Sequence, residues 1–293
     1  MGFISSIICF IGFLGLLHFI WYVYKVLYTY LSKPKDLKSK NIKWCLITGA
    51  SSGVGYELAL KISKQGVNII ALGRNEDSLS KLEKDIQNNQ SNIEFVKYSI
   101  DFSDYEKIGK LFSEIIPQLM NNQKVEIDSL FLCHGGATIK ALEDFSNKEI
   151  EDYNNAFITS NVIIAKDFVN QGGKGITVIS SANSFVHSAY VDQYAAVKRW
   201  LNRFFNTLKI ESNIPIQILN PGVIKDTQFF DKVPPGTKEL VKPPESALTP
   251  QRVADMVLAT YDKNFEVDIG IDCILYRVVF WVIPQPIVDY IMF

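Results

Sequence analysis

The stretch "ITGASSGVGYELALKISKQG", residues 47–66, places three glycines between an apolar run and an amphipathic run. The apolar "WCLITG" predicts a strand, and "GYELALKISKQG" predicts a helix that ends at a glycine. The first N–H groups of such a helix are unpaired, and with the helix dipole they bind anions such as a pyrophosphate. Because side chains would block that approach, Gly49, Gly53 and Gly55 predict a dinucleotide-binding turn.

The turn by itself leaves an alternative open, since any tight turn can use glycine. Its spacing, G-x-x-x-G-x-G, also departs from the G-x-G-x-x-G pattern. The rest of the chain supports the dinucleotide hypothesis, because strand-like and helix-like runs alternate. The strand-like runs are "VNIIALG", "IEFVKYSI", "SLFLCHGG", "GITVISS" and "IQILNPG". This alternation predicts an α/β fold, a doubly wound Rossmann-like parallel sheet with helices on both faces, over residues 43–270.

Composition narrows the possible functions. With 293 residues, 47% of them hydrophobic and 21% charged, the chain can bury the core of one large domain. A net charge of −1 argues against nucleic acid as a partner, because neutralising phosphates needs a basic surface. The four cysteines and three histidines are scattered, so we expect neither a disulfide framework nor a metal site.

The N-terminus predicts a membrane anchor. Residues 3–24 carry no charge, which is about the length a bilayer-spanning helix needs, and the run ends in interface-favouring aromatic residues. Six lysines follow before residue 44, so the positive-inside rule places the main domain in the cytosol. We therefore expect an anchor over residues 1–25 and a basic linker over 26–42. The alternative, a buried core helix, is disfavoured by the length of the uncharged run.

Three further residues predict carbonyl chemistry. Tyr194 and Lys198 lie four apart on a predicted helix and so share one face, and Ser181 ends the preceding strand. A phenol beside an ammonium is expected to have a lowered pKa and to act as a general acid toward a carbonyl oxygen. The serine hydroxyl can hold the same oxygen as it gains negative charge. Without Ser181 and the glycine turn, the Tyr–Lys pair would be an ordinary helix surface pair.

Taken together, "TGASSGVG" (48–55), Ser181 and "YAAVK" (194–198) resemble the short-chain dehydrogenase/reductase family over nearly the whole domain. The resemblance implies a catalytic tetrad of Asn155, Ser181, Tyr194 and Lys198. It also implies cofactor contacts from Gly49, Ser51, Ser52, Gly53, Gly55, Asp101, Tyr194, Lys198, Pro221, Gly222 and Thr227. Two of these assignments keep an alternative. Asp101 can instead cap the following helix, and Asn155 can be an ordinary exposed helical residue.

The chain departs from the family pattern at "CHGG" (133–136), where the family usually has Asn-Asn-Ala-Gly. We expect His134 to take the place of the asparagine as a hydrogen-bonding spacer. After the second strand, a NAD-selective enzyme places an acid, whereas this chain has Gly73 followed by Arg74. The small residue leaves room for a 2′-phosphate that the guanidinium can bind, so the predicted cofactor is NADPH.

The C-terminal "DCILYRVVFWVIPQPIVDYIMF" is apolar but broken by charges and prolines, so residues 271–293 predict an interfacial membrane-associated tail rather than a span. In residues 227–250, which form a substrate lid in the family, Phe229 and Phe230 either meet an acyl chain or pack the lid. The anchor points to a lipid ketone as substrate.

The anchor, "KQGVNIIALGRNEDSLSKL" and "YSIDFSDYEKI" are similar to the 3-ketodihydrosphingosine reductase branch of the family. This similarity implies reduction of 3-ketosphinganine at the cytosolic face of the endoplasmic reticulum membrane. A very-long-chain 3-oxoacyl-CoA or steroid ketone reductase is the alternative enzyme, and a non-catalytic NADPH-binding scaffold is an alternative of another class. The family also implies a possible homodimer through the helix that carries Tyr194.

Overall fold

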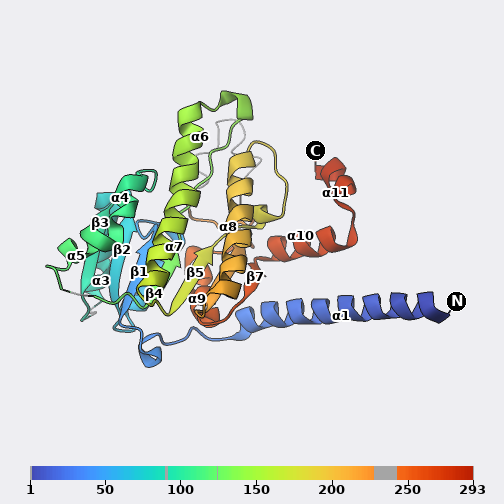
Figure 1. Cartoon of the computed structure of the whole chain (residues 1–293), viewed down its shortest axis with the longest axis horizontal. Coiled ribbons are helices and arrows are strands. Elements are labelled where there is room, and N and C mark those ends of the chain that lie inside the picture. The colour runs from blue at the N-terminus through green and yellow to red at the C-terminus, as the bar shows by residue number, and fades with distance from the viewer. Residues whose placement is uncertain (1, 90–91, 124, 228–242, 293) are drawn as a thin grey trace.

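The centre of the molecule is a parallel sheet (Figure 1). The computed structural model describes residues 2–89, 92–123, 125–227 and 243–292, in which seven strands pair in the order β3-β2-β1-β4-β5-β6-β7. The strands are β1 (Trp44–Thr48), β2 (Asn68–Gly73), β3 (Phe95–Ser99), β4 (Ser129–Leu132), β5 (Gly175–Ile179), β6 (Ile216–Pro221) and β7 (Glu266–Ile269).

Helices connect and cover the strands. They are α1 (Gly2–Leu31), α2 (Gly53–Ser63), α3 (Glu76–Asn88), α4 (Tyr105–Gly109), α5 (Ile116–Leu119), α6 (Asn147–Asn154), α7 (Ser160–Asn170), α8 (Asp192–Glu211), α9 (Pro250–Thr260), α10 (Ile271–Val282) and α11 (Gln285–Met292). Two π-helical turns, Leu111–Ile115 and Asn155–Thr159, interrupt the helical segments beside them.

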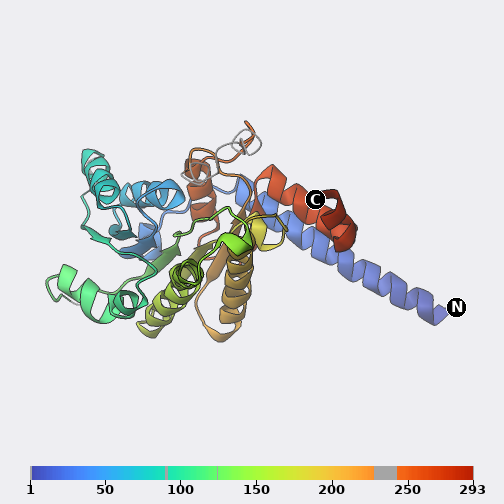
Figure 2. The same ribbon diagram turned by 90° about the horizontal axis from the view of Figure 1, so that it is seen from above.

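The sheet is buried on both faces, which explains the continuous apolar runs of its strands. In β1, Cys45 and Ile47 join the core beneath α2, α3 and α9, whereas Trp44 and Leu46 join the core beneath α4, α7 and α8. Figure 2 shows these two helical layers from above. The predicted doubly wound α/β fold is confirmed.

The strand order creates a crevice at the carboxyl ends of the central strands. The chain runs outward from β1 through β2 to β3 and then crosses back, so that β4 pairs with the other side of β1. The C-terminal ends of β1 and β4 therefore lie at a topological switch point, where open α/β sheets bind ligands. The glycine turn follows β1 at this point.

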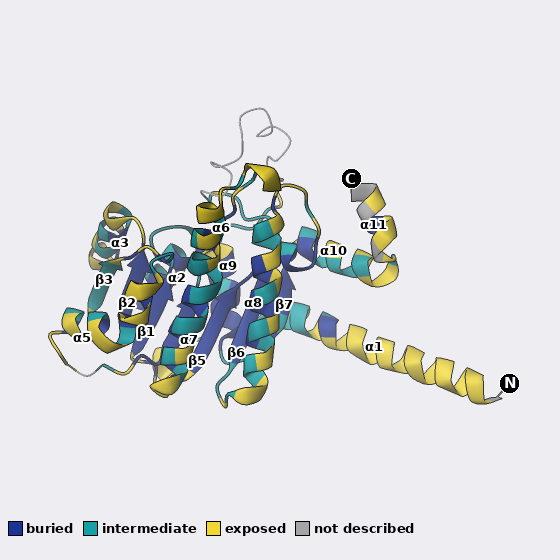
Figure 3. Cartoon of the chain, turned by 45° about the horizontal axis from the view of Figure 1, so that its top comes forward, coloured by how far each residue is buried: buried dark blue, intermediate teal, exposed yellow. Residues whose placement is uncertain are grey.

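Helix α1 projects from the β7 side of the sheet (Figures 1 and 3). Among the described residues, it is the one helix long and apolar enough to cross a membrane, over Phe3–Leu31. Its C-terminal half is docked on the domain, where Lys25 Nζ donates to the Glu266 carbonyl oxygen at 2.6 Å and the Gly270 N–H donates to the Tyr30 hydroxyl at 2.7 Å.

Helix α10 lies beside α1, with α11 beyond it (Figure 2). The Trp281 ring packs edge-on against His18 and Tyr22, at centroid distances of 5.2 and 4.7 Å. The tail is thus two helices separated near Pro284, which cannot continue α10. Large apolar side chains of the tail remain exposed, namely Ile271, Leu275, Tyr276, Val279, Trp281, Val282, Ile287 and Tyr290.

Several boundaries differ from the sequence-based expectations. Helix α1 continues six residues past the expected end of the anchor, to Leu31, because Tyr30 and its neighbours pack on the domain. The helical segment from Tyr105 to Leu119 is divided by the π-helical turn at Leu111–Ile115. Helix α9 and strand β7, which complete the sheet, were not assigned from the sequence.

Candidate active site

The glycine turn is closely packed. Gly49 has φ of +67°, and a Cβ there would lie 2.7 Å from the His134 Cα. A Cβ on Gly55 would lie 2.4 Å from the Gly49 carbonyl oxygen. Ser52, the residue before α2, is extended and its side chain forms no capping hydrogen bond. The first N–H groups of α2 therefore remain available to an anion in the cavity that Ser51, Ser52 and Gly53 line.

The predicted Ser–Tyr–Lys group comes together in that cavity. Ser181 follows β5 and is buried, Tyr194 lies in the first turn of α8, and Lys198 lies one turn later. Ser181 and Tyr194 are joined by a side-chain hydrogen bond. The Lys198 Nζ donates to the Ile179 carbonyl oxygen at 2.8 Å and lies 5.7 Å from the centroid of the Tyr194 ring. All three side chains line one cavity.

The pKa of Tyr194 differs from the expectation. Burial raises the pKa of its hydroxyl, and the hydrogen bond with Ser181 opposes that shift. Burial also lowers the pKa of Lys198 to about 8. The expectation that Lys198 lowers the pKa of Tyr194 is wrong for this arrangement, because the ammonium is bound to a backbone carbonyl and desolvation dominates. A protonated phenol is the form that a general acid needs.

Asn155 is the first residue of the π-helical turn between α6 and α7. Its side-chain oxygen accepts a hydrogen bond from the Thr159 hydroxyl at 3.2 Å. The next two residues, Ala156 and Phe157, line the cavity, whereas Asn155 itself does not. π-Helical turns are frequent at functional sites, but a role for Asn155 in proton transfer stays a prediction.

His134 is a buried structural residue. Its Nδ1 is 2.7 Å from the Thr48 hydroxyl, and its Nε2 is 3.0 Å from the Ala156 carbonyl oxygen. Its ring stacks on Phe102 at 4.0 Å. These contacts join β1, β4 and the π-helical turn, which agrees with the expected spacer role. Burial lowers the pKa of His134 to about 3, so the ring is neutral near pH 7.

This buried histidine predicts an acid sensitivity. The unfolded chain binds the proton near the ordinary pKa of 6.5, whereas the folded protein does not until about 3. Its stabilising contribution is therefore complete above pH 6.5 and falls by about 1.4 kcal/mol per pH unit below it. Between pH 7.5 and 5.5, we expect the wild type to lose about 1.4 kcal/mol more stability than His134→Asn. Unfolding midpoints in detergent at the two pH values measure this difference, and equal losses would contradict it.

The end of the cavity beside β2, away from Tyr194, is suited to an adenosine 2′-phosphate. A Cβ on Gly73 would lie 2.9 Å from the Ser51 side chain, so an acidic side chain does not fit there. Arg74 is exposed and lines the cavity, as does Asp101. The Asp101 carboxylate accepts from Ser103 at 2.9 Å. The alternative that Asp101 caps the next helix is wrong, because Asp104 caps α4.

The remaining predicted cofactor residues lie at the end of β6 or after it. Pro221, Gly222 and Thr227 all line the cavity, and the Thr227 hydroxyl donates to the Ile224 carbonyl oxygen at 3.2 Å. Phe229 and Phe230, the proposed lid aromatics, lie outside the described residues. The cavity measures about 1200 Å³ and extends from Arg74 to Tyr276 on α10. Two further lining residues, Asp272 and Tyr276, were not predicted from the sequence, although an acid within an apolar tail was a usable signal.

Fold and site together define an oxidoreductase built on a dinucleotide-binding sheet. Residues 43–238 match the family described as short chain dehydrogenase. Because this match covers more than half of the chain, the protein belongs to the short-chain dehydrogenase/reductase family.

Curated relatives include enzymes with several substrates. A putative steroid dehydrogenase of Caenorhabditis elegans is 34% identical over 115 residues, which are 36% of each chain, so the match spans about a third of that relative. A 7beta-hydroxysteroid dehydrogenase of Mediterraneibacter gnavus is 23% identical over 80% of this chain and 88% of its own. A 3-ketodihydrosphingosine reductase of Debaryomyces hansenii is 25% identical over 76% of this chain and 73% of its own.

A solved structure supports the fold. The L-sorbose reductase of Gluconobacter frateurii, in complex with NADPH and L-sorbose, superposes with a TM-score of 0.66 at 19% identity. The superposition covers 78% of this chain and 95% of the reductase. At this identity the likeness concerns the fold alone.

Proposed function

We propose that the protein is a membrane-anchored, NADPH-dependent reductase of a lipid ketone. The observation that carries this proposal is the Ser181–Tyr194 hydrogen bond inside a cavity whose far wall belongs to α10. That helix packs along the apolar α1 through Trp281. A carbonyl-reducing centre is thus built next to the segment that is suited to lie in a bilayer.

The cavity suits NADPH. The 2′-phosphate would bind Arg74 beside Gly73, the pyrophosphate would bind the α2 N-terminus, and the nicotinamide end would contact Pro221 and Gly222. When bound, the cofactor supplies a hydride to the ketone carbon.

The protein residues supply the remaining chemistry. Tyr194 donates a proton to the ketone oxygen, and the Ser181 hydroxyl holds that oxygen as negative charge develops on it. Lys198, whose Nζ lies 5.7 Å from the centroid of the Tyr194 ring, would hold the nicotinamide ribose. Asn155 holds a water in the proton relay from solvent.

The membrane arrangement follows from both ends of the chain. Helix α1 spans the bilayer and the lysines after it hold the domain in the cytosol, at the endoplasmic reticulum. Helix α10, which packs on α1 through Trp281, and helix α11 beyond it carry exposed apolar side chains that would enter the same leaflet. Because Tyr276 of α10 also lines the cavity, a membrane-resident ketone has a short path to Tyr194.

We infer that the ketone is 3-ketosphinganine, which the protein reduces to sphinganine. The similarity to the Debaryomyces hansenii reductase over three quarters of both chains supports this choice. The steroid dehydrogenases among the relatives support a steroid ketone as the second candidate.

The test is NADPH oxidation by the full-length protein in detergent with 3-ketosphinganine, a long-chain 3-oxoacyl-CoA or a steroid ketone, repeated with NADH. We expect turnover of the sphingoid ketone with a preference for NADPH. Turnover of another ketone alone would keep the chemistry and reject the substrate. Tight NADPH binding without any turnover would reject the reductase in favour of a scaffold.

A further inference from the structure

An acidic side chain without a cationic partner lies in the cavity wall. Asp272 is the second residue of α10 and lines the cavity together with Tyr276. Its Oδ2 accepts a hydrogen bond from the Val223 N–H at 2.7 Å. None of the ion pairs among the described residues involves Asp272. Its negative charge is therefore available to a ligand.

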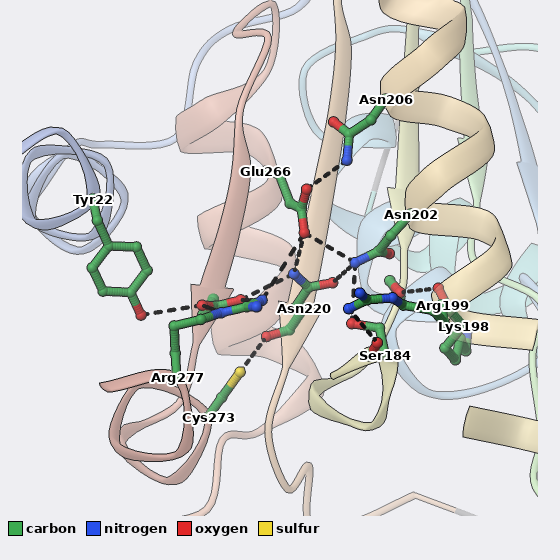
Figure 4. A network of polar contacts seen from close by, with 12 residues as sticks. Tyr22, Ser184, Lys198, Arg199, Asn202, Asn206, Asn220, Glu266, Cys273 and Arg277 are labelled. Atoms are coloured by element: carbon green, nitrogen blue, oxygen red, sulfur yellow. Dashed lines mark hydrogen bonds and ion pairs between the residues drawn. The ribbon is translucent and has the colours of Figure 1, made fainter. Parts of the chain in front are cut away.

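The arginine of α10, Arg277, forms an ion pair with Asp268 and not with Asp272. Arg277, labelled in Figure 4, binds Asp268 through two hydrogen bonds, at 2.7 and 2.9 Å. Its guanidinium lies 3.4 Å from the centroid of the Phe185 ring. Asp268 also accepts hydrogen bonds from Tyr22 and Asn220. The charge of Asp268 is thus fully compensated, and the arginine that compensates it cannot serve Asp272.

The Asp272 carboxylate is held in a fixed place. A Cβ on Gly222 would lie 2.1 Å from its Oδ1 and 2.3 Å from its Oδ2, and a Cβ on Gly270 would lie 2.6 Å from Oδ1. The two glycines leave the space that the carboxylate fills, while the Val223 N–H fixes one of its oxygens. A carboxylate held in this way needs little reorganisation to bind a cation.

The same wall carries the reacting groups. Cys273, the residue after Asp272, packs in one buried cluster with Ala182, the residue after Ser181. Its thiol also donates to the Asn220 carbonyl oxygen at 3.1 Å, next to Pro221. Through Cys273 the start of α10 therefore shares a buried cluster with the segment after Ser181, and both Asp272 and Ser181 line the cavity.

We propose that Asp272 binds an ammonium group on the carbon next to the ketone, and so selects α-amino ketones. This inference rests on the proposed lipid-ketone reduction and names its specificity residue. An ammonium would form a charge-assisted hydrogen bond with the carboxylate. A ketone with a neutral group on this carbon, such as a steroid ketone or a 3-oxoacyl thioester, would cover the carboxylate without supplying a cation. A sphingoid ketone carries the amine at this position, whereas steroid ketones and 3-oxoacyl thioesters do not.

The test compares two substrates that differ only in this amine, namely 3-ketosphinganine and the same hydroxyketone without its amino group. Full-length wild type is compared with Asp272→Asn, whose amide oxygen can still accept from Val223. We expect kcat/KM for the amino ketone to fall about 10- to 100-fold and kcat/KM for the des-amino ketone to stay equal or rise. The matched control is Asp255→Asn on α9, where Asp255 forms an ion pair with Lys61 of α2.

The outcomes separate the proposed role of Asp272 from the proposed lipid-ketone reduction. Equal losses for both ketones would overturn the proposal and assign Asp272 to cofactor binding or to structure. A wild type that reduces the des-amino ketone as well as the amino ketone would also overturn it, without any variant, and would leave lipid-ketone reduction standing. Failure of wild type on every ketone would instead reject the proposed function. If the variant does not fold, competitive inhibition of the wild type is measured instead. A long-chain primary amine should inhibit ketone reduction at a lower concentration than the matching alcohol, and equal inhibition would overturn the proposal.

Discussion

Replacing Tyr194 with Phe is expected to lower kcat by about 10²- to 10⁴-fold, because the ketone oxygen loses its proton donor. The phenol is joined to Ser181 by a hydrogen bond, and burial raises its pKa and so keeps it protonated. The substitution removes one oxygen and leaves the ring in the α8 packing. The measurement is single-turnover NADPH oxidation with the ketone that the wild type reduces.

The dissociation constant for NADPH is the control for this variant. We expect it to change by less than about threefold, since the loss concerns the transition state and not cofactor binding. Activity within tenfold of the wild type would reject Tyr194 as the proton donor. A parallel loss of NADPH affinity would show that the phenol acts through the cofactor site instead.

Replacing Arg277 with Met is expected to destabilise the folded protein by about 3–5 kcal/mol, because it leaves the Asp268 charge buried without a cation. The Asp268 side chain is only 3% exposed, and Arg277 supplies two of its hydrogen bonds. Around this pair, side chains of α1, β6 and α10 converge, as Figure 4 shows. For a domain of this size, the loss corresponds to a decrease in the unfolding temperature of about 10 °C.

The double variant Arg277→Met with Asp268→Asn is the matched control. Removing the buried charge should restore a large part of the lost stability, since the single variant is penalised mainly for an uncompensated carboxylate. If both variants unfold at the same temperature, Arg277 acts through its packing on Phe185 and not through its charge. Thermal unfolding of the full-length protein in detergent distinguishes the two results.

Much of the fold and site could be predicted from sequence because the relevant signals are local. A buried parallel strand needs an apolar run, a dinucleotide turn needs glycines at the start of a helix, and a shared helix face needs a four-residue spacing. These rules located β1, α2, Tyr194 and Lys198. Helix α9 and strand β7 lacked an equally clear pattern, and they take their places by packing against α2 and β6.

The sequence by itself determined the doubly wound domain, the Ser181–Tyr194–Lys198 group and the apolar N-terminal helix, because each depends on residues close together in the chain. Tertiary structure decided the rest. Tyr22 meets Asp268 across 246 positions, and no periodicity in either segment encodes that contact. Desolvation set the pKa of Tyr194 against the expected direction. Arg277 pairs with Asp268, whereas Asp272 lines the cavity. This division between the two acids depends on how three distant segments of the chain pack.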